Sequence, residues 1–404
     1  KYLIFRVLIH SNCFDSMKIF ISSDLAPPYI GGGETYTIKL ATGLVKEGHE
    51  VHWLTSRIPD TFSEEVLDGV KIHRVPILFK NHYVFPGRQS FAMTSLIKGI
   101  KLARQCDVVQ INTLVPGISG WLIAKYAGKP SLLFCHEFFN NLWRTIGQNS
   151  FEKYVYPVIE NLMCKVPYDW FVCPSEYSKT TIMANGIPGD KITVILHGID
   201  EKIFNNNNGN HKKPLNLEGS PTFGYFGRLR LKKTAQSKNL LTLLKAAALV
   251  IKQMPSAKLV LAGMGYEELV PYVKEMGLES NVVYVGKLEY ENIPNFLKAC
   301  DVVVCPALTD GFCFLLGEAG ACGVATVATN LGAHKERIEE RKTGLLAENT
   351  PLDISEKIIS LLNDRPLRES LGQNASEKFK GFTWKKSVRK HLEVYENVIQ
   401  KKHL

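Results

Sequence analysis

Short apolar runs that alternate with longer amphipathic stretches constrain the fold of this chain more than any other feature of its sequence. The runs are rich in β-branched side chains, as buried strands are. In the first half of the chain they cover residues 18–23, 50–55, 108–111, 131–135, 170–173 and 193–196. Helical periods lie between them, for example over residues 34–47. The alternation predicts a sheet of parallel strands with helices on its faces.

The same alternation begins again after a polar, unpatterned segment over residues 201–220, which we interpret as a linker. The strand candidates of this second series are 222–226, 258–262, 281–285, 301–305 and 325–329. A chain of 404 residues is too long for one ordinary core. We therefore expect an N-terminal domain over residues 17–200, a C-terminal domain over 221–381 and a final helical segment over 382–404. Residues 1–16 are treated as an N-terminal extension, because Met17 directly precedes the first strand.

Bulk composition narrows the class of protein. Hydrophobic residues make up 45% and charged residues 22%, as in ordinary globular proteins. No apolar run has the length needed to cross a bilayer. The nine cysteines include no Cys-x-x-Cys pair, and several lie in apolar runs. This usage favours a reducing compartment, so we expect a cytoplasmic protein.

The net charge of +10 indicates attraction to an anionic partner. Nucleic acid is discounted as a partner because no nucleic-acid-binding motif is present. Lys98, Lys101 and Arg104 recur on a predicted helix whose other face would hold apolar residues, namely Leu96, Ile97, Ile100 and Ala103. A solvated helix face is the favoured interpretation. Docking on an anionic membrane surface is the alternative, which would make the protein peripheral to the cytoplasmic face of a membrane.

The segment from Asp301 to Gly323 reads as a strand, a loop and a buried helix. The N-terminus of such a helix offers free amide groups and a positive dipole end to phosphate. Asp310 lies in the loop and Glu318 in the helix, so the carboxylates would be at most ~12 Å apart along a continuous helix. That span suits a nucleotide sugar, with one hydroxyl-bearing ring on each side of a diphosphate. The alternatives are a Glu318–Lys pair and an ordinary Asp-Gly turn.

Other residues at the carboxyl ends of predicted strands could complete such a site. Gly32 and Gly33 precede a helix, where backbone amides can approach a diphosphate closely, although a plain turn explains them almost as well. Arg228 and Lys238 follow one strand and could neutralise a leaving diphosphate, or be surface charges. His136 follows another and could contact a sugar hydroxyl, or be a structural histidine.

Two further patterns limit the chemistry. His197 begins a segment that is more typical of a turn than of a site. No Asp-x-Asp pair occurs in the chain, although enzymes that hold a diphosphate through a divalent cation usually need paired carboxylates. We therefore expect neither a metal nor another cofactor.

Taken in order, these segments resemble the retaining glycosyltransferases of family 4. The matching segments cover nearly the whole chain: 27–34, 48–51, 174–176, 227–229, 238–239, 301–306, 310–318, 321–323, 328–329 and 382–384. The resemblance implies the GT-B fold, in which two Rossmann-like doubly wound domains face each other across a cleft. It also implies that the C-terminal helix returns to the N-terminal domain.

The activity implied by this resemblance is transfer of a hexose-type sugar from a nucleotide-diphosphate donor, such as a UDP- or GDP-sugar. Transfer would retain the anomeric configuration, need no metal, and use a glycan or lipid-linked acceptor. By position, Arg228 and Lys238 would hold the diphosphate, and Glu318 the ribose hydroxyls. Asp310 and the backbone of residues 311–314 would hold the donor sugar, with His136 at the reacting face. The residues of that backbone segment are Gly311, Phe312, Cys313 and Phe314.

The sequence departs from the family pattern at a few positions. Asp310 stands where glutamate is usual, Cys313 where glycine is common, and Ala333 and Lys335 in place of a glycine and a proline. These departures bear on donor choice. Asp310, Cys313 and Ala333 also keep open a catalytically degenerate partner subunit that binds nucleotide. A nucleotide-sugar epimerase of the same fold is a further alternative.

Overall fold

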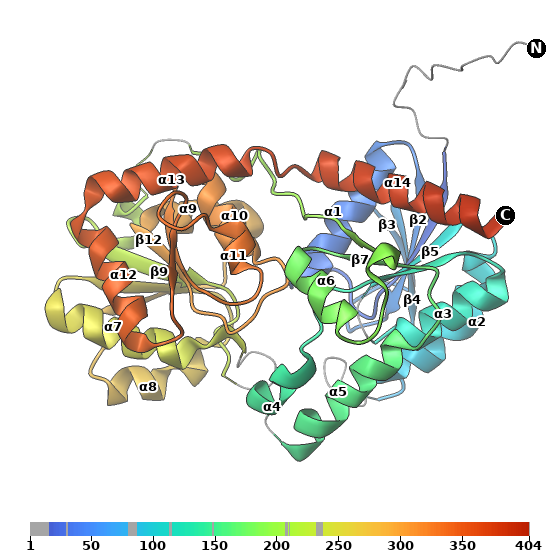
Figure 1. Ribbon diagram of the computed structural model, residues 1–404, viewed down its shortest axis with the longest axis horizontal. Helices are drawn as coiled ribbons and strands as arrows, with labels where there is room; N and C mark the ends of the chain where they lie inside the picture. The colour runs from blue at the N-terminus through green and yellow to red at the C-terminus, as the bar shows by residue number, and fades with distance from the viewer. Residues whose placement is uncertain are drawn as a thin grey trace, which may run out of the picture.

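The computed structural model of the chain describes residues 16–29, 31–79, 87–112, 115–147, 149–206, 209, 211–231 and 237–403. Two α/β lobes lie side by side, and the chain crosses from the C-terminal lobe back to the N-terminal lobe just before its long last helix (Figure 1). Each lobe is built on a mainly parallel sheet with helices on its faces, as the alternation of short strands and helical periods predicts. The predicted extension, apart from Ser16, lies outside the described residues.

The sheet of the N-terminal lobe has eight strands in the order β3-β4-β2-β1-β5-β6-β7-β8. They are β1 (Lys18–Ser22), β2 (Glu50–Ser56), β3 (Glu64–Leu67), β4 (Val70–Val75), β5 (Val108–Asn112), β6 (Ser131–Phe134), β7 (Trp170–Cys173) and β8 (Ile192–Val194). Neighbours are parallel except β3 and β4, which form an antiparallel pair at one edge. The buried central strands were predicted, whereas β3 and β4, with their polar and half-exposed residues, were not.

Six helices surround this sheet within the described part of the lobe. They are α1 (Gly32–Lys46), α2 (Phe91–Ala103), α3 (Gly117–Ala127), α4 (Trp143–Ile146), α5 (Ser150–Cys164) and α6 (Glu176–Met183). The prediction that Ile97 belongs to the buried face of α2 is wrong, because its side chain is 88% exposed. The buried residues of α2 instead recur every fourth position, at Phe91, Ser95, Gly99 and Ala103. The lack of a side chain at Gly99 allows Ile123 of α3 to pack closely against α2.

The C-terminal lobe has a six-stranded parallel sheet in the order β11-β10-β9-β12-β13-β14. Its strands are β9 (Thr222–Phe226), β10 (Lys258–Ala262), β11 (Val282–Gly286), β12 (Val302–Cys305), β13 (Ala325–Thr329) and β14 (Leu345–Ala347). Its helices are α7 (Leu240–Gln253), α8 (Val270–Glu275), α9 (Ile293–Ala299), α10 (Phe314–Ala321), α11 (His334–Arg337), α12 (Pro351–Asn363) and α13 (Arg365–Phe379). From the segment interpreted as a linker, Phe204 and Leu217 are buried in this lobe's core.

Helix α14 (Trp384–His403) returns to the N-terminal lobe and packs against α1 (Figure 1). Gly43 makes the close crossing possible, because a Cβ there would lie 2.5 Å from Cγ2 of Val388. Tyr36 and His391 share a hydrogen bond of 2.8 Å between the hydroxyl and Nε2. The helix therefore ties the two lobes together.

Candidate active site

The loop between β12 and α10 holds an ion pair at its centre. Asp310 Oδ2 accepts a hydrogen bond of 2.6 Å from Nζ of Lys238, which lies just before α7. Its Oδ1 accepts from the backbone amides of Phe312 and Cys313, at 3.2 and 2.6 Å. Burial alone would raise the pKa of Asp310, but the Lys238 ammonium and these amides lower it to about 2. The carboxylate is therefore charged and fixed in one orientation.

Helix α10 begins at Phe314, so only the second half of the stretch from Asp310 to Glu318 is helical. Cys313 takes the left-handed conformation before it, with φ of +59°. The turn lets the loop wrap around the Asp310 carboxylate. Sequence reasoning located the loop and the helix, and the structure adds the sharp turn between them.

Glu318 lies inside α10 with only 5% of its surface exposed. Within the described part of the chain, no hydrogen bond to its carboxylate is present. Burial raises its pKa to about 8, and the charge of Lys39 from the other lobe only partly opposes this rise. Lys39 instead forms an ion pair of 2.9 Å with Asp200 and lies over the ring of Tyr290. The alternative of a Glu318–Lys pair is thus not found among the described residues, and the carboxyl group is left for another partner.

His136 lies between the two lobes. A Cβ on Gly33 of α1 would be 3.3 Å from its Nε2, and a Cβ on Gly311, in the loop between β12 and α10, would be 2.0 Å from its carbonyl oxygen. The carbonyl of His136 accepts a hydrogen bond of 3.0 Å from the Ser178 hydroxyl. Nε2 is buried and has no partner among the described residues. Burial lowers the pKa of His136 to about 4, so its imidazole is neutral near pH 7.

Arg228 is exposed just beyond the end of β9, with no hydrogen bond to another described residue. Burial raises the pKa of Tyr225 in β9, and the charges of Lys238 and Arg228 both oppose this rise. The charge of Arg228 also lowers the pKa of Glu34 in the other lobe. Two cations therefore stand at the carboxyl end of β9, facing the start of α1.

The N-terminus of α1 at Gly32 and Gly33 is covered by the side chain of Glu34. A Cβ on Gly31 would lie 2.5 Å from Glu34 Oε2, which shows how closely the carboxyl group folds back over the helix start. Burial raises the pKa of Glu34 to about 7. Nearby, the Arg88 guanidinium donates a hydrogen bond to Asp24. The sequence did not predict this cluster of Glu34, Asp24 and Arg88, because Arg88 comes from a distant segment that contains no recognisable motif.

The lobes touch directly beside the site. Glu336 of α11 accepts hydrogen bonds from the backbone amides of Glu176 and Tyr177, at 3.0 and 2.7 Å, and so caps the start of α6 in the other lobe. Tyr177 and Thr309 share a hydrogen bond of 3.2 Å between their hydroxyl groups. Ala333, which departs from the family pattern, is buried and donates its amide to the carbonyl of Asp310 at 3.1 Å. The departure at residue 333 therefore fits the loop without disturbing it.

The sequence favours a turn without a site role for His197. In the structure its ring instead lies against the loop between β12 and α10. Its ring lies 4.6 Å from that of Phe312 and 5.1 Å from that of Phe314, measured between centroids. It is buried, and neither ring nitrogen has a partner among the described residues. A histidine three residues after the last strand of the N-terminal sheet was the available signal.

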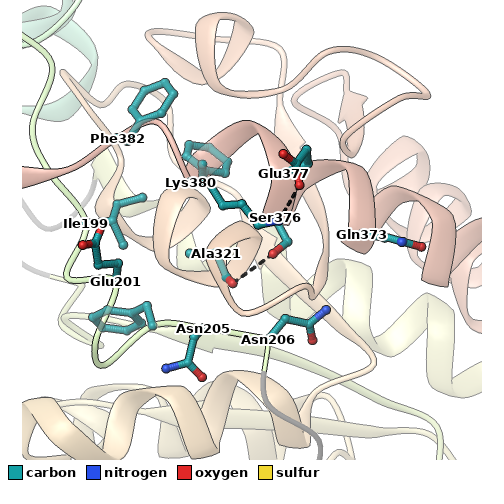
Figure 2. A pocket seen from close by; sticks show the side chains of 12 residues that line it. Ile199, Glu201, Asn205, Asn206, Ala321, Gln373, Ser376, Glu377, Lys380 and Phe382 are labelled. Carbon is teal, nitrogen blue, oxygen red and sulfur yellow. Dashed lines mark hydrogen bonds and ion pairs between the residues drawn. The ribbon is translucent and has the colours of Figure 1, made fainter.

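A pocket of about 290 Å³ lies away from these residues, beyond the C-terminal end of α10. Figure 2 shows Ala321, Ser376 and Phe382 around it, with Ser376 donating a hydrogen bond of 3.4 Å to the carbonyl of Ala321. None of the predicted site residues lines this pocket. The ion pair and the unpaired Glu318 mark the candidate site better than this cavity does.

The fold and the residues at the sheet edges define a two-lobed glycosyltransferase. A family model described as Glycosyltransferase Family 4 matches residues 30–202, and one described as Glycosyl transferases group 1 matches residues 207–378. The chain belongs to this family of glycosyltransferases, with the GT-B fold. The suspected family and the predicted fold class are confirmed.

Individual relatives agree with this assignment. An uncharacterised glycosyltransferase of Methanocaldococcus jannaschii is 28% identical over 95% of this chain and 99% of its own length. The UDP-Gal:alpha-D-GlcNAc-diphosphoundecaprenol alpha-1,3-galactosyltransferase of Escherichia coli is 25% identical over 95% of this chain and 98% of its own. The structure of Anabaena HepE in complex with UDP-glucose aligns with a TM-score of 0.74 at 19% identity, covering 93% of this chain and 98% of that one. No described helix has both the length and the apolar character needed to span a membrane.

Proposed function

We propose that this protein transfers a hexose-type sugar from a UDP- or GDP-sugar to a glycan or lipid-linked acceptor, with retention and without a metal ion. The observation that carries the proposal is the Lys238–Asp310 pair, set directly before the N-terminus of α10, whose positive dipole end suits an anionic ligand. The charges of Lys238 and Arg228 would offset the charge that develops on the leaving diphosphate.

The neighbouring groups suit the two ends of such a donor. Glu318, buried and without a hydrogen-bond partner among the described residues, is suited to accept hydrogen bonds from ribose hydroxyls. Asp310 and the backbone of Gly311 to Phe314 would hold the donor sugar, with the amides of Phe312 and Cys313 orienting the Asp310 carboxylate. The neutral imidazole of His136 would contact that sugar where the acceptor enters.

A uridine donor is our first choice. Anabaena HepE was crystallised with UDP-glucose, and the Escherichia coli relative is named for transfer from UDP-Gal. A thermal-shift screen of UDP-, GDP- and ADP-sugars would identify the donor, since a ligand that binds only the folded protein raises its melting temperature. We expect a UDP-sugar to give the largest shift.

Transfer itself is tested with the selected donor and a panel of glycan and lipid-linked acceptors. We expect release of the nucleotide diphosphate only when an acceptor is present, and full activity in excess EDTA. NMR should show the same anomeric configuration in the product as in the donor. Arg228→Ala and Glu318→Ala should both lose activity. Loss of all turnover in EDTA, with recovery on adding magnesium or manganese, would contradict the metal-independent mechanism.

The same assays separate the alternative functions. Nucleotide release or sugar isomerisation without any acceptor would favour the epimerase. A nucleotide-induced thermal shift without turnover on any acceptor would favour the degenerate partner subunit. Equal hydrolysis by the wild type, Arg228→Ala and Glu318→Ala would show that the site assignment is wrong.

The acceptor side of the proposal includes docking on an anionic membrane. Helices α2 and α3 pack side by side and expose apolar side chains, with Met93 69%, Ile97 88% and Tyr126 63% exposed. Lys101 and Lys125 are exposed beside them. Lys98 does not contribute a free charge, because it pairs with Glu64.

Exposed apolar side chains with flanking cations are suited to a membrane surface. Flotation with anionic and neutral liposomes tests this docking, and we expect binding to anionic vesicles that weakens as salt rises. Ile97→Ser combined with Lys101→Ser should abolish it. Absence of binding at low salt would contradict the membrane proposal and leave the proposed transfer reaction intact.

A further inference from the structure

Two cysteines and a histidine lie together at the loop between β12 and α10, which we call the donor loop because residues 310–314 would hold the donor sugar. Cys305 ends β12, Cys313 precedes α10 and His334 begins α11. Their Sγ and ring nitrogen atoms all lie within 4.8 Å of one another, and all three side chains are buried. We call Cys305, Cys313 and His334 the Cys-His cluster. The proposed transfer reaction gives it no role.

The spacing of the cluster is close to that of a metal-ligand set. Sγ of Cys305 lies 3.2 Å from Sγ of Cys313 and 3.5 Å from Nε2 of His334. Tetrahedral zinc, with Zn–S of about 2.3 Å and Zn–N of about 2.0 Å, places two sulfurs ~3.8 Å apart and sulfur and nitrogen ~3.5 Å apart. The Cys305–His334 distance already matches, and the two sulfurs would need to separate by roughly 0.5 Å.

His334 is oriented as a ligand requires. Its Nδ1 donates a hydrogen bond of 2.9 Å to the backbone carbonyl of Thr329, which leaves the lone pair of Nε2 directed at Cys305. Metal-binding histidines are commonly held in this way by a carbonyl on the other ring nitrogen. Two thiols and one imidazole are soft and borderline donors, which select zinc(II) or copper(I) over magnesium or calcium.

We infer that the Cys-His cluster is a binding site for one thiophilic metal ion of the zinc(II) or copper(I) class. The ion would join β12, the start of α10 and the start of α11. These segments surround Asp310, which is held by the amides of Cys313 and Ala333. A bound ion would therefore fix the donor loop from below. The site is separate from the diphosphate-binding cations, and the inference does not depend on the proposed function.

The test is metal titration of tag-free, reduced, chelator-treated protein. Cobalt(II) serves as the optical probe for the zinc class, and copper(I) is supplied in competition with a coloured chelator. We expect one tight equivalent per chain, a sulfur-to-cobalt charge-transfer band, and a higher melting temperature with the bound ion than in chelator. Tight cobalt(II) binding with a tetrahedral spectrum assigns the site to the zinc class, and tight copper(I) binding without it assigns the site to the copper(I) class.

Matched variants locate the site. Cys313→Gly removes one ligand at a position with φ of +59°, which glycine accepts without strain, and should remove the band and the equivalent. His334→Asn keeps an amide donor for the Thr329 carbonyl but lacks Nε2, and should weaken binding by at least about tenfold. Cys322→Ala, a buried cysteine outside the cluster, should leave binding unchanged.

Three results would overturn the inference. The first is no tight equivalent for either probe, and the second is an equivalent and band that persist in both Cys313→Gly and His334→Asn. The third is a Cys305–Cys313 disulfide in protein purified without reductant, detected by peptide mass, because that pair would then be a redox pair. If Cys313→Gly fails to fold, His334→Asn alone decides the question.

Discussion

Replacing Asp310 by asparagine tests the centre of the candidate site. The side chains of Asp310 and Lys238 are only 20% and 23% exposed, so little solvent screens their attraction. The pKa of Asp310 falls from an ordinary 3.8 to about 2 on folding. At 1.36 kcal/mol per unit, this corresponds to roughly 2.5 kcal/mol of stability at pH 7. Because the folded-state pKa is the lower one, that contribution is complete above about pH 4 and is lost as the pH falls through 2.

We expect Asp310→Asn to lower the free energy of unfolding in urea by roughly 2–3 kcal/mol at pH 7 and to flatten its dependence on pH below 4. Donor affinity should fall as well, by about 10- to 100-fold, because a charge-assisted hydrogen bond is worth about 1.5–3 kcal/mol. Isothermal titration calorimetry with the sugar nucleotide that the thermal-shift screen selects measures this loss. Asparagine keeps the shape of the side chain, so the change reports on charge.

Asp301→Asn is the matched control. Asp301 pairs with Lys212 at the same distance of 2.6 Å and with similar exposure, but at the amino end of β12, far along the strand from the donor loop. It should lower stability without changing donor affinity. Asp310→Asn combined with Lys238→Met should recover stability relative to Asp310→Asn alone, because no unpaired buried charge remains, yet still fail to bind donor. Equal donor affinity in Asp310→Asn and Asp301→Asn would refute the role of Asp310.

Further perturbations probe the rest of the site. The folded-state pKa of Glu318 is raised from 4.5 to about 8, so the buried carboxyl group destabilises the protein increasingly as the pH rises through that range. Glu318→Gln should therefore raise the free energy of unfolding in urea by roughly 3 kcal/mol at pH 7 and by little at pH 5. The same change should weaken UDP binding. Glu34, with a pKa of about 7, should ionise as pH rises and repel the diphosphate, so calorimetric UDP affinity should fall from pH 6 to pH 8 in the wild type but not in Glu34→Gln. Gly43→Val should clash with Val388 and cost about 1–3 kcal/mol, seen as a lower melting temperature by circular dichroism that Val388→Ala partly restores. A flat pH profile for wild-type UDP binding, unchanged stability in Glu318→Gln or an unchanged melting temperature in Gly43→Val would each contradict its prediction.

The fold was largely predictable because its central strands are buried on both faces. Strands such as β1 and β12 read as continuous apolar runs with helical periods beside them, and this pattern needs no knowledge of distant contacts. The edge strand β3 has no buried residue, and its neighbour β4 carries charged and polar side chains among its buried ones, so neither sequence reads as a continuous apolar run. The exposure of Ile97 was not predictable either, because the sequence around an apolar residue on a surface helix does not show whether that residue is buried.

The sequence could predict which strand ends contribute residues to the candidate site, but not which of their side chains contact one another. Asp310 and Lys238 were both placed at the correct sheet edge, whereas their hydrogen bond joins residues that are 72 positions apart in the chain. The position of Glu34 over the start of α1 depends on side-chain conformation, which the Gly-Gly-Gly-Glu pattern does not reveal. His197 was assigned to a turn because the aromatic rings around it come from segments far along the chain.

The groups left unpaired in the free protein point to one kind of ligand. Buried polar groups without partners cost stability, so their retention at one place needs a partner that arrives later. Nε2 of His136 and the carboxyl group of Glu318 are two such groups, and both suit hydroxyl groups. Lys238, which is paired with Asp310, and the exposed Arg228 suit an anion. On the proposed assignment, a hexose phosphate would leave Glu318 unpaired, and a nucleotide alone would leave His136 unpaired. A molecule with a hydroxylated ring on each side of a diphosphate would engage all four residues, which is why both halves of the donor should be needed for the largest thermal shift.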